Sequence, residues 1–508
     1  MTDRTDAGIH ETKTLKKVSF PNAPVYLGFL IFYIWLAAQI PYTHDDWDWG
    51  LDVGIQQLLT ANINSRYVGN FFVIIMTRSK LVQTIIMGAG FFLLPFLLSE
   101  TVFGKSTRWT KADKLNGFLL SNALILSMNI SIWQQTYGWV SGYANFGLSA
   151  IFLCIILRRC LNVFDETPSE SNKFHPRVVL IFLTCLAGQL FLENMAIYIF
   201  LMAIFINIFH WRRTKTFSCA YMAILLAALI GLVIMFSSSL YQTLWSTGEA
   251  VNGYRQLLVN SQTNLQDFVL GCFRQILRIP FYLYANNTFL CAAIVVLMSI
   301  LCIQNKKTCR QTKVCMVLNS LLVICLILSN YLSAIVGSFI SVLFFVTVTG
   351  ELIWYFKENK PVLGKMLFVW ISPVCIILPI VVTSELGSRL FFTTNAILVL
   401  FALFLLSFTL KSASKKGYYT IIFSVIAGLL LLQHGAVYYA IGECSRERNA
   451  IIENAVQTNA DEILLPQYPY GNYLWGPNPT KASREQYFKE FYGIAADVSV
   501  EIEGISSP

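Results

Sequence analysis

The sequence predicts an all-α polytopic membrane protein with about 13 transmembrane helices, and three observations support this class. Of the 508 residues, 56% are hydrophobic and 13% are charged, whereas soluble globular proteins carry roughly 25% charged residues. Apolar runs recur along the chain, and about 20 apolar residues are enough to cross a bilayer core as a helix. Short clusters of Lys and Arg separate the runs, as topology signals do. The net charge of +9 is therefore interpreted as topological, and nucleic acid is excluded as a partner.

The apolar runs define the predicted spans. A polar, basic segment at 1–23 precedes the first run, and no small-residue cleavage site follows that run, so we interpret it as a retained helix. The predicted transmembrane domain covers 24–440, and the prolines and aromatic residues of 441–508 disfavour a further span. The predicted spans are 24–41, 80–99, 117–131, 146–160, 178–192, 195–210, 219–236, 288–304, 314–329, 334–355, 366–383, 391–410 and 418–440.

The distribution of basic residues predicts the orientation in the cell membrane. Of the 37 Lys and Arg residues, 25 fall on the side that holds the N-terminus and 12 on the other side. By the positive-inside rule the N-terminus is cytoplasmic, and an odd number of spans places the C-terminus outside. The external segments are long and aromatic, which indicates that the function resides on that face. They are predicted at 42–79, 132–145, 237–287, 383–390 and 441–508.

An acidic motif follows the first predicted span directly, where residues 44–49 read HDDWDW. Two adjacent carboxylates at a membrane surface repel each other, so either Asp45 or Asp46 is expected to have a raised pKa and to serve as a general base. Two other interpretations stay open from the residues alone. The motif could be a hydrated acidic loop that caps the next helix, or His44 and the carboxylates could form a divalent metal site.

Aromatic and amide side chains dominate the second external loop, which includes Trp139 and Asn145. An aromatic face stacks on the C–H face of a sugar ring, and amides bond its hydroxyl groups. The alternative is a belt of aromatic residues at the membrane interface. The amides and glycines of this loop favour a sugar site.

Charged residues at tight turns form a further group of candidates. Glu193 and Asn194 stand between two apolar runs with almost no loop, so Glu193 either faces a polar cavity or reaches water at the turn. Arg389 occupies a short outer hairpin, where its guanidinium can bind a phosphate as a fork. The other interpretation of Arg389 is a salt bridge to Glu385 in the same hairpin, and the two roles are compatible.

These motifs, taken in order, resemble a largely uncharacterised family of bacterial multi-spanning proteins. That family is similar to the membrane glycosyltransferases of the GT-C fold, such as protein O-mannosyltransferases and aminoarabinose transferases. The resemblance spans nearly the whole chain, and Ser65 departs from it where the pattern has glycine. It is carried by the acidic pair, Arg66-Tyr67, the segment 139–146, Glu193-Asn194, Gly387-Ser388-Arg389 and Phe491-Tyr492-Gly493.

The resemblance implies transfer of a sugar from a polyprenyl-phosphate donor to a cell-surface glycan or related acceptor. By this analogy Asp45 is the base, and Asp46 orients the acceptor or the base. Arg389, Arg274 and Arg278 are expected to bind the donor phosphate, because a phosphate leaving group needs cationic stabilisation. The expected sugar- or acceptor-binding residues are His44, Arg66, Tyr67, Trp139, Asn145, Glu193 and Asn194.

The sequence also bears on cofactors and on two other functional classes, a transporter and a non-catalytic scaffold. The sequence contains no glycine-rich phosphate loop after a strand, so no nucleotide-sugar site is expected, and a divalent metal stays an open alternative. A transporter or flippase of a lipid-linked or small polar substrate would also be polytopic, but the sequence lacks the internal repeats that are typical of transporters. A non-catalytic scaffold does not explain why acidic, aromatic and basic groups cluster on one face.

The 12 cysteines show no metal-type CxxC pair. Most of them fall inside predicted spans, where a thiol behaves as a small apolar group. The cysteines within spans are Cys154, Cys185, Cys219, Cys291, Cys315, Cys325 and Cys375.

Overall fold

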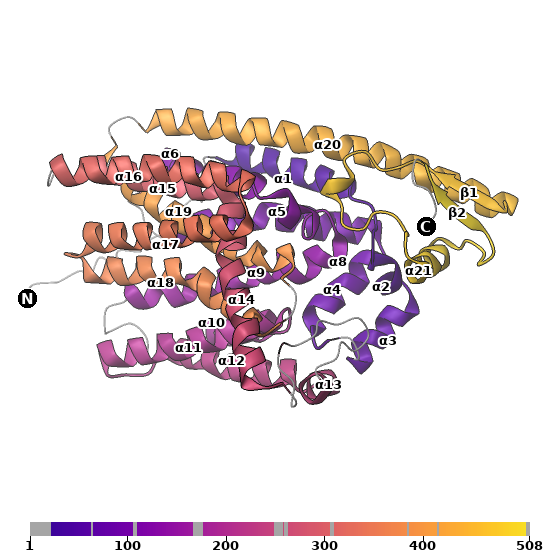
Figure 1. Ribbon diagram of the computed structural model, residues 1–508, viewed down its shortest axis with the longest axis horizontal. Helices are drawn as coiled ribbons and strands as arrows, with labels where there is room; N and C mark the ends of the chain where they lie inside the picture. The colour runs from indigo at the N-terminus through magenta and orange to yellow at the C-terminus, as the bar shows by residue number, and fades with distance from the viewer. Residues whose placement is uncertain are drawn as a thin grey trace, which may run out of the picture.

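The computed structural model describes residues 22–61, 64–104, 109–165, 176–247, 258, 263–304, 309–383, 386–413 and 416–503. In this part of the chain nearly all regular structure is helical (Figure 1). Long apolar helices run side by side as a bundle, and a two-stranded sheet lies near the C-terminus. The predicted class, an all-α polytopic membrane protein, is confirmed.

Ten helical segments of the described chain are long and apolar enough to cross a membrane. Each of the 13 predicted runs overlaps a helix, but three of these helices are shorter: α1 (Ala23–Ala38), α6 (Lys111–Leu126) and α10 (Arg177–Gln189). At 1.5 Å per residue α1 covers about 24 Å, less than the ~30 Å bilayer core. The number of 13 spans therefore stays a prediction.

Each of the ten candidate spans has a mean hydropathy high enough for the interior of a bilayer. They are formed by α5 (Lys80–Phe103), α8 (Val140–Gly142) continuing through η1 (Tyr143–Gly147) and α9 (Leu148–Cys160), α11 (Glu193–Thr214), α12 (Cys219–Phe236), α14 (Leu265–Leu283) with α15 (Thr288–Gln304), α16 (Cys309–Leu328), α17 (Ala334–Phe356), α18 (Lys360–Ile377), α19 (Phe392–Ser412) and α20 (Gly417–Thr458).

Helix α19 forms the centre of the bundle. Every residue from Ala396 to Leu406 is buried, which is expected of a helix that is apolar on all sides. It packs against α18, α15, α6 and α5. In contrast, α14 crosses the direction of the bundle helices (Figure 1), and its apolar residues gather on one face, as in helices that lie along a membrane interface.

Several short helices gather at one end of the bundle, which the positive-inside assignment predicts to be external (Figure 1). Polar turns interrupt the apolar pattern here, so the chain changes direction repeatedly. These helices are α2 (Asp46–Gly50), α3 (Asp52–Thr60), α4 (Tyr67–Thr77), α7 (Ile130–Gln134) and α13 (Ser239–Thr247).

The helix that contains the last predicted span, α20, continues past 440 to Thr458 without a break. Its 42 residues correspond to about 63 Å, and its polar half extends beyond the bundle (Figure 1). Strand β1 (Glu462–Leu465) then pairs in parallel with β2 (Ser499–Ile502), and α21 (Ala482–Tyr492) forms the crossover between them.

A small second core connects this C-terminal segment to the acidic motif. Trp47 is buried against Phe488 of α21, with 5.1 Å between the ring centroids. Ile452 of α20 and Leu465 of β1 belong to the same core. Because Trp47 lies between the aspartates of the motif, this core holds α2 in place from the far end of the chain.

Candidate functional site

The backbone at the acidic motif adopts an unusual conformation. His44 has φ 55°, in the left-handed region, which costs a non-glycine residue roughly 1–2 kcal/mol. The His44 N–H donates to the carbonyl oxygen of Gly476 at 3.1 Å. A Cβ atom at Gly476 would come within 2.7 Å of the His44 ring. The C-terminal segment therefore stabilises the turn that aims Asp45, and strain of this kind clusters at functional sites.

Asp45 faces a cavity, with 22% of its side chain exposed. Its Oδ1 accepts a hydrogen bond from Trp139 Nε1 at 2.9 Å and lies 3.6 Å from His44 Nδ1. Desolvation alone would raise the pKa of Asp45, but its interaction with His44 and the charges of Arg484 and Arg389 outweigh it. The pKa of Asp45 is therefore below its ordinary value, and the group is a carboxylate at neutral pH.

Asp46 is completely buried behind Asp45. Its Oδ1 accepts from the backbone N–H of Ser141 at 2.8 Å and from the Ser141 hydroxyl at 2.5 Å, and its Oδ2 accepts from the Thr43 N–H at 2.9 Å. Burial and the neighbouring Asp45 charge raise the pKa of Asp46 to about 8, although these hydrogen bonds oppose the shift. The expected raised pKa therefore belongs to Asp46, and the proposed base Asp45 is the acidic member of the pair.

The raised pKa of Asp46 predicts a pH dependence of stability. The folded protein holds this proton up to about pH 8, whereas the unfolded chain releases it near its ordinary value of 3.8. The Asp46 contribution to stability is therefore complete below about pH 4 and is lost as the pH rises through about 8. Thermal unfolding in detergent should show a Tm that falls over this interval. Asp46→Asn should remove the part of the fall that comes from Asp46, whereas the part from Asp48, whose pKa is raised to about 7, should remain. The exposed Asp52 offers a control, since Asp52→Asn should leave it unchanged. An equal fall in all three proteins would contradict the assignment.

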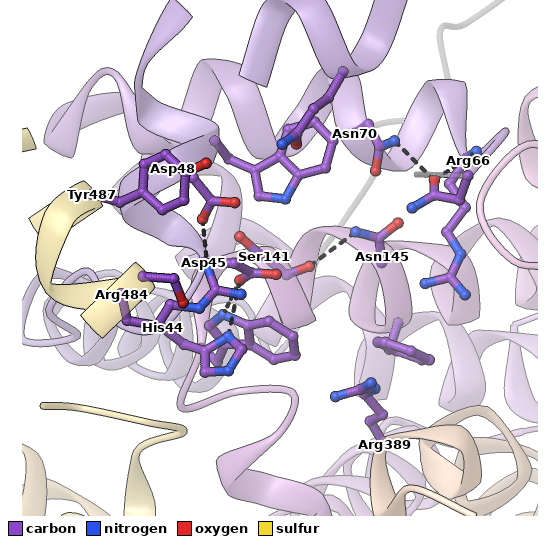
Figure 2. A pocket seen from close by; sticks show the side chains of 16 residues that line it. His44, Asp45, Asp48, Arg66, Asn70, Ser141, Asn145, Arg389, Arg484 and Tyr487 are labelled. Carbon is purple, nitrogen blue, oxygen red and sulfur yellow. Dashed lines mark hydrogen bonds and ion pairs between the residues drawn. The ribbon is translucent and has the colours of Figure 1, made fainter. Parts of the chain in front are cut away.

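The acidic motif opens into a polar cavity of about 580 Å³ (Figure 2). Cavities of roughly 300–1,000 Å³ are typical of small-molecule sites. The structure brings together six side chains that the sequence singled out from four separate segments. They are His44, Asp45, Arg66, Trp139, Asn145 and Arg389.

Arg389 enters the cavity from η6 (Ser388–Phe391), just before α19. Its guanidinium carbon lies 5.5 Å from the centre of a Trp139 ring and 5.8 Å from that of Phe146, at cation–π distance. In Figure 2 the Arg389 side chain lies on the same side of the cavity as Arg66 and Asn145. Glu385, the alternative partner of Arg389, lies outside the described residues.

Arg66 is held by a turn and by an ion pair. Its backbone N–H donates to Asn64 Oδ1 at 3.0 Å, an Asx turn that Asn70 supports with a 2.9 Å hydrogen bond to the same oxygen. Ser65 needs no left-handed backbone here, so the turn forms without the glycine of the family pattern. The Arg66 guanidinium forks onto Glu193, at 3.1 and 3.2 Å from Nε and 2.8 Å from Nη2.

Glu193 therefore faces a partner and a cavity, and not open water. It is the first residue of α11, where the helix dipole favours a negative charge, and it also accepts from the Tyr241 hydroxyl at 2.7 Å. Its neighbour Asn194 donates to the carbonyl of Ile376 at 3.1 Å. Both residues line a second cavity of about 270 Å³, whose other lining is mostly apolar and includes Phe236, Leu244, Trp245, Ile380 and Leu390.

Besides the buried Asp46, three expected site residues line neither of these cavities. Arg274 and Arg278 lie on the exposed face of α14, because Gln275 and Ile279 form its buried face. Neither arginine lines the polar cavity in this structure, and their binding of the donor phosphate stays a prediction. Tyr67 begins α4 and is half-buried outside both linings.

The C-terminal segment forms one wall of the polar cavity, and its Arg484 was not among the expected site residues. Arg484 of α21 lines the polar cavity and donates to Asp48 Oδ1 at 2.8 Å. Burial and the Asp45 charge raise the pKa of Asp48 to about 7, and the Arg484 charge opposes this shift. Nearby, a Cβ atom at Gly138 would lie 1.9 Å from the Tyr473 carbonyl oxygen, so the segment packs directly onto the second external loop.

Some of the other residues that line the polar cavity could have been predicted from the sequence, and others could not. Ser141 belongs to the amide- and aromatic-rich loop, and Asn70 interrupts the apolar run of α4, which is a usable signal. Gln57, Arg484 and Tyr487 stand in ordinary polar surroundings. Their role depends on the packing of distant segments, and no local pattern marks it.

The positions of the donor atoms in the acidic motif bear on the alternative that it is a metal site. In the described part of the chain, the only three His, Cys, Asp or Glu ligand atoms that gather within 4.8 Å of one another lie elsewhere. Asp46 is engaged with Ser141 and Thr43, and Asp48 with Arg484. The donors of the motif therefore do not converge on one point as a metal site requires.

Comparison with known proteins adds no assignment, since no protein-family model, no curated protein and no solved structure matches this chain.

Proposed function

We propose that the protein is a membrane glycosyltransferase, which moves a sugar from a polyprenyl-phosphate donor to a glycan or related acceptor on the predicted external face. One observation carries the proposal: the polar cavity around Asp45 and the apolar cavity below Glu193 share Arg66 in their linings. An amphiphilic donor needs such a pair of spaces. Its sugar phosphate fits the polar cavity, and the first isoprene units fit the apolar one.

The polar cavity supplies the groups that the transfer needs. The carboxylate of Asp45 accepts the proton of the acceptor hydroxyl as its oxygen attacks the anomeric carbon. The bond from that carbon to the phosphate oxygen breaks, and the leaving phosphate gains negative charge. Arg389 is placed to stabilise this charge as a planar fork. In the same lining the amide oxygen of Asn145 has no hydrogen-bond donor in the described part of the chain and can accept from a sugar hydroxyl.

The local electrostatics leave Asp45 as the ionised carboxylate of the pair, and its lowered pKa makes it the weaker base of the two. Asp46, with its pKa near 8, carries a proton at neutral pH, so it adds little negative charge beside the leaving phosphate. Its hydrogen bonds to Ser141 and Thr43 hold the backbone that presents Asp45. Asp46 is thus a positioning residue in this proposal.

The direct test uses the purified full-length protein in lipid nanodiscs with a panel of polyprenyl-phosphate sugars. Release of polyprenyl phosphate, with the sugar recovered on an acceptor or in water, is the expected result. Asp45→Asn protein serves as the inactive reference. If no donor is cleaved, while a lipid-linked sugar moves between the leaflets of proteoliposomes, the protein is a flippase and the proposal fails.

A further inference from the structure

A second group of reactive side chains lies far from the polar cavity, at the other end of the bundle. Cys302 stands near the end of α15, Cys315 near the start of α16, and Glu351 near the end of α17. The end of α15, the start of α16 and the end of α17 point away from the C-terminal segment (Figure 1). The orientation predicted from the basic residues makes this end cytoplasmic.

The ligand atoms of these residues converge from three helices. Both thiol sulfurs and a Glu351 carboxylate oxygen lie within 4.8 Å of one another. Tetrahedral zinc ligands with bonds of 2.0–2.3 Å stand about 3.3–3.8 Å apart. A shift of roughly 1 Å in the side chains would therefore close the group around one ion.

The Glu351 carboxylate of this cluster is buried with only weak hydrogen-bond donors among the described residues, Asn319 and the Cys315 thiol. Glu351 is 6% exposed, and its Oε1 has no hydroxyl or N–H donor in the described part of the chain. Its Oε2 accepts a long hydrogen bond of 3.4 Å from Asn319, one helical turn after Cys315. A buried, half-satisfied carboxylate between apolar helices is costly unless a partner is present. A cation bound by Oε1 would provide that partner.

We propose that Cys302, Cys315 and Glu351 form a binding site for a thiophilic divalent cation, primarily Zn²⁺. The bound cation would cross-link α15, α16 and α17. Two sulfur donors and one carboxylate select Zn²⁺ over Mg²⁺ and Ca²⁺, which take oxygen ligands. Binding replaces the two thiol protons, which pass to solvent. The fourth tetrahedral position is left to water.

The occupied site would carry a negative net charge, and basic residues are close to it in the sequence. Two thiolates and one carboxylate around Zn²⁺ leave a net charge of about −1. The segment 304–313, which joins α15 to the start of α16, carries Lys306, Lys307, Arg310 and Lys313.

Metal content of the full-length protein, purified through a tag without histidine, tests the proposal. After treatment with a chelator and addition of Zn²⁺ alone, mass spectrometry of the washed protein should find about one zinc per chain. The double variant Cys302→Ser, Cys315→Ser should lose it, and Glu351→Gln should weaken Zn²⁺ affinity at least about tenfold. Co²⁺ in place of Zn²⁺ should give the visible absorption of thiolate-ligated cobalt.

The same helices offer matched controls. Cys291 of α15 and Cys325 of α16 lie outside the cluster, so Cys291→Ser and Cys325→Ser should retain the zinc. Alkylation of the wild-type protein gives a readout that does not depend on the folding of any variant. Zn²⁺ should protect Cys302 and Cys315 from alkylation, and peptide mapping identifies the modified cysteines. Equal zinc content in the double variant and the controls would overturn the site. So would alkylation of both thiols at the same rate with and without Zn²⁺.

Discussion

Asp45→Asn is expected to lower the turnover of a polyprenyl-phosphate sugar by about 10² to 10⁴ while the protein stays folded. The substitution keeps the size of the side chain, and an amide oxygen can still accept the 2.9 Å hydrogen bond from Trp139. What is lost is the carboxylate that takes the proton of the acceptor hydroxyl. Initial rates of polyprenyl phosphate release, measured beside the thermal stability of each protein, check the prediction.

The neighbouring aspartates provide the comparison. Asp46→Asn should reduce turnover less than Asp45→Asn, because Asp46 is buried behind the cavity and orients the turn. Asp52→Asn, on the exposed face of α3, should leave turnover at the wild-type level. Near-wild-type turnover in the Asp45→Asn, Asp46→Asn double variant would falsify the catalytic assignment and return the motif to a hydrated loop. If a chelator reproduces the loss in the wild type, the metal interpretation of the motif gains support instead.

Arg389→Lys is expected to reduce kcat/KM for the lipid-linked donor by about 10- to 100-fold, the loss of roughly 1.5–3 kcal/mol from a charge-assisted hydrogen bond. A lysine supplies a point charge where the arginine supplies a planar fork. The Arg389 guanidinium also packs beside the rings of Trp139 and Phe146, which helps to hold its plane. Steady-state kinetics over a range of donor concentrations measure the effect.

A matched arginine on the same predicted side of the membrane is the control. Arg274 lies on the exposed face of α14, so Arg274→Lys should leave the donor kinetics unchanged. Unchanged KM and kcat in Arg389→Lys would assign Arg389 to structure. A loss in both variants would instead place the α14 face in contact with the donor, and the conformation described here would then differ from the donor-bound one.

The sequence alone was sufficient for the fold class. In a bilayer every backbone N–H and C=O must be paired within the segment, so a long apolar run has essentially one structure. For this reason all 13 predicted runs overlap helices. The predicted span ends at 440 whereas α20 continues beyond it, because hydropathy marks where a segment leaves the membrane and not where its helix ends. Continuation to Thr458 depends on Ile452 and Ala455, which pack in the small C-terminal core.

The candidate site was predictable in part. Charged, amide and aromatic residues that interrupt apolar runs at one predicted membrane face are conspicuous, and six of them line one cavity. Arg274 and Arg278 met the same criterion, yet helical spacing shows only that they share a face. It does not show which way that face points, and the packing of Gln275 and Ile279 turned both arginines outward.

By itself, then, the sequence determined that the chain is a helical membrane protein and that its reactive groups concentrate at one predicted face. Only the tertiary structure decided that Asp46 is buried while Asp45 faces the cavity, and that Arg484 reaches Asp48 across 436 positions of the chain. It also brought Cys302, Cys315 and Glu351 together from three helices. The physical reason is that composition and periodicity report the surroundings of one segment, whereas distances between remote segments are set by the packing of the whole bundle.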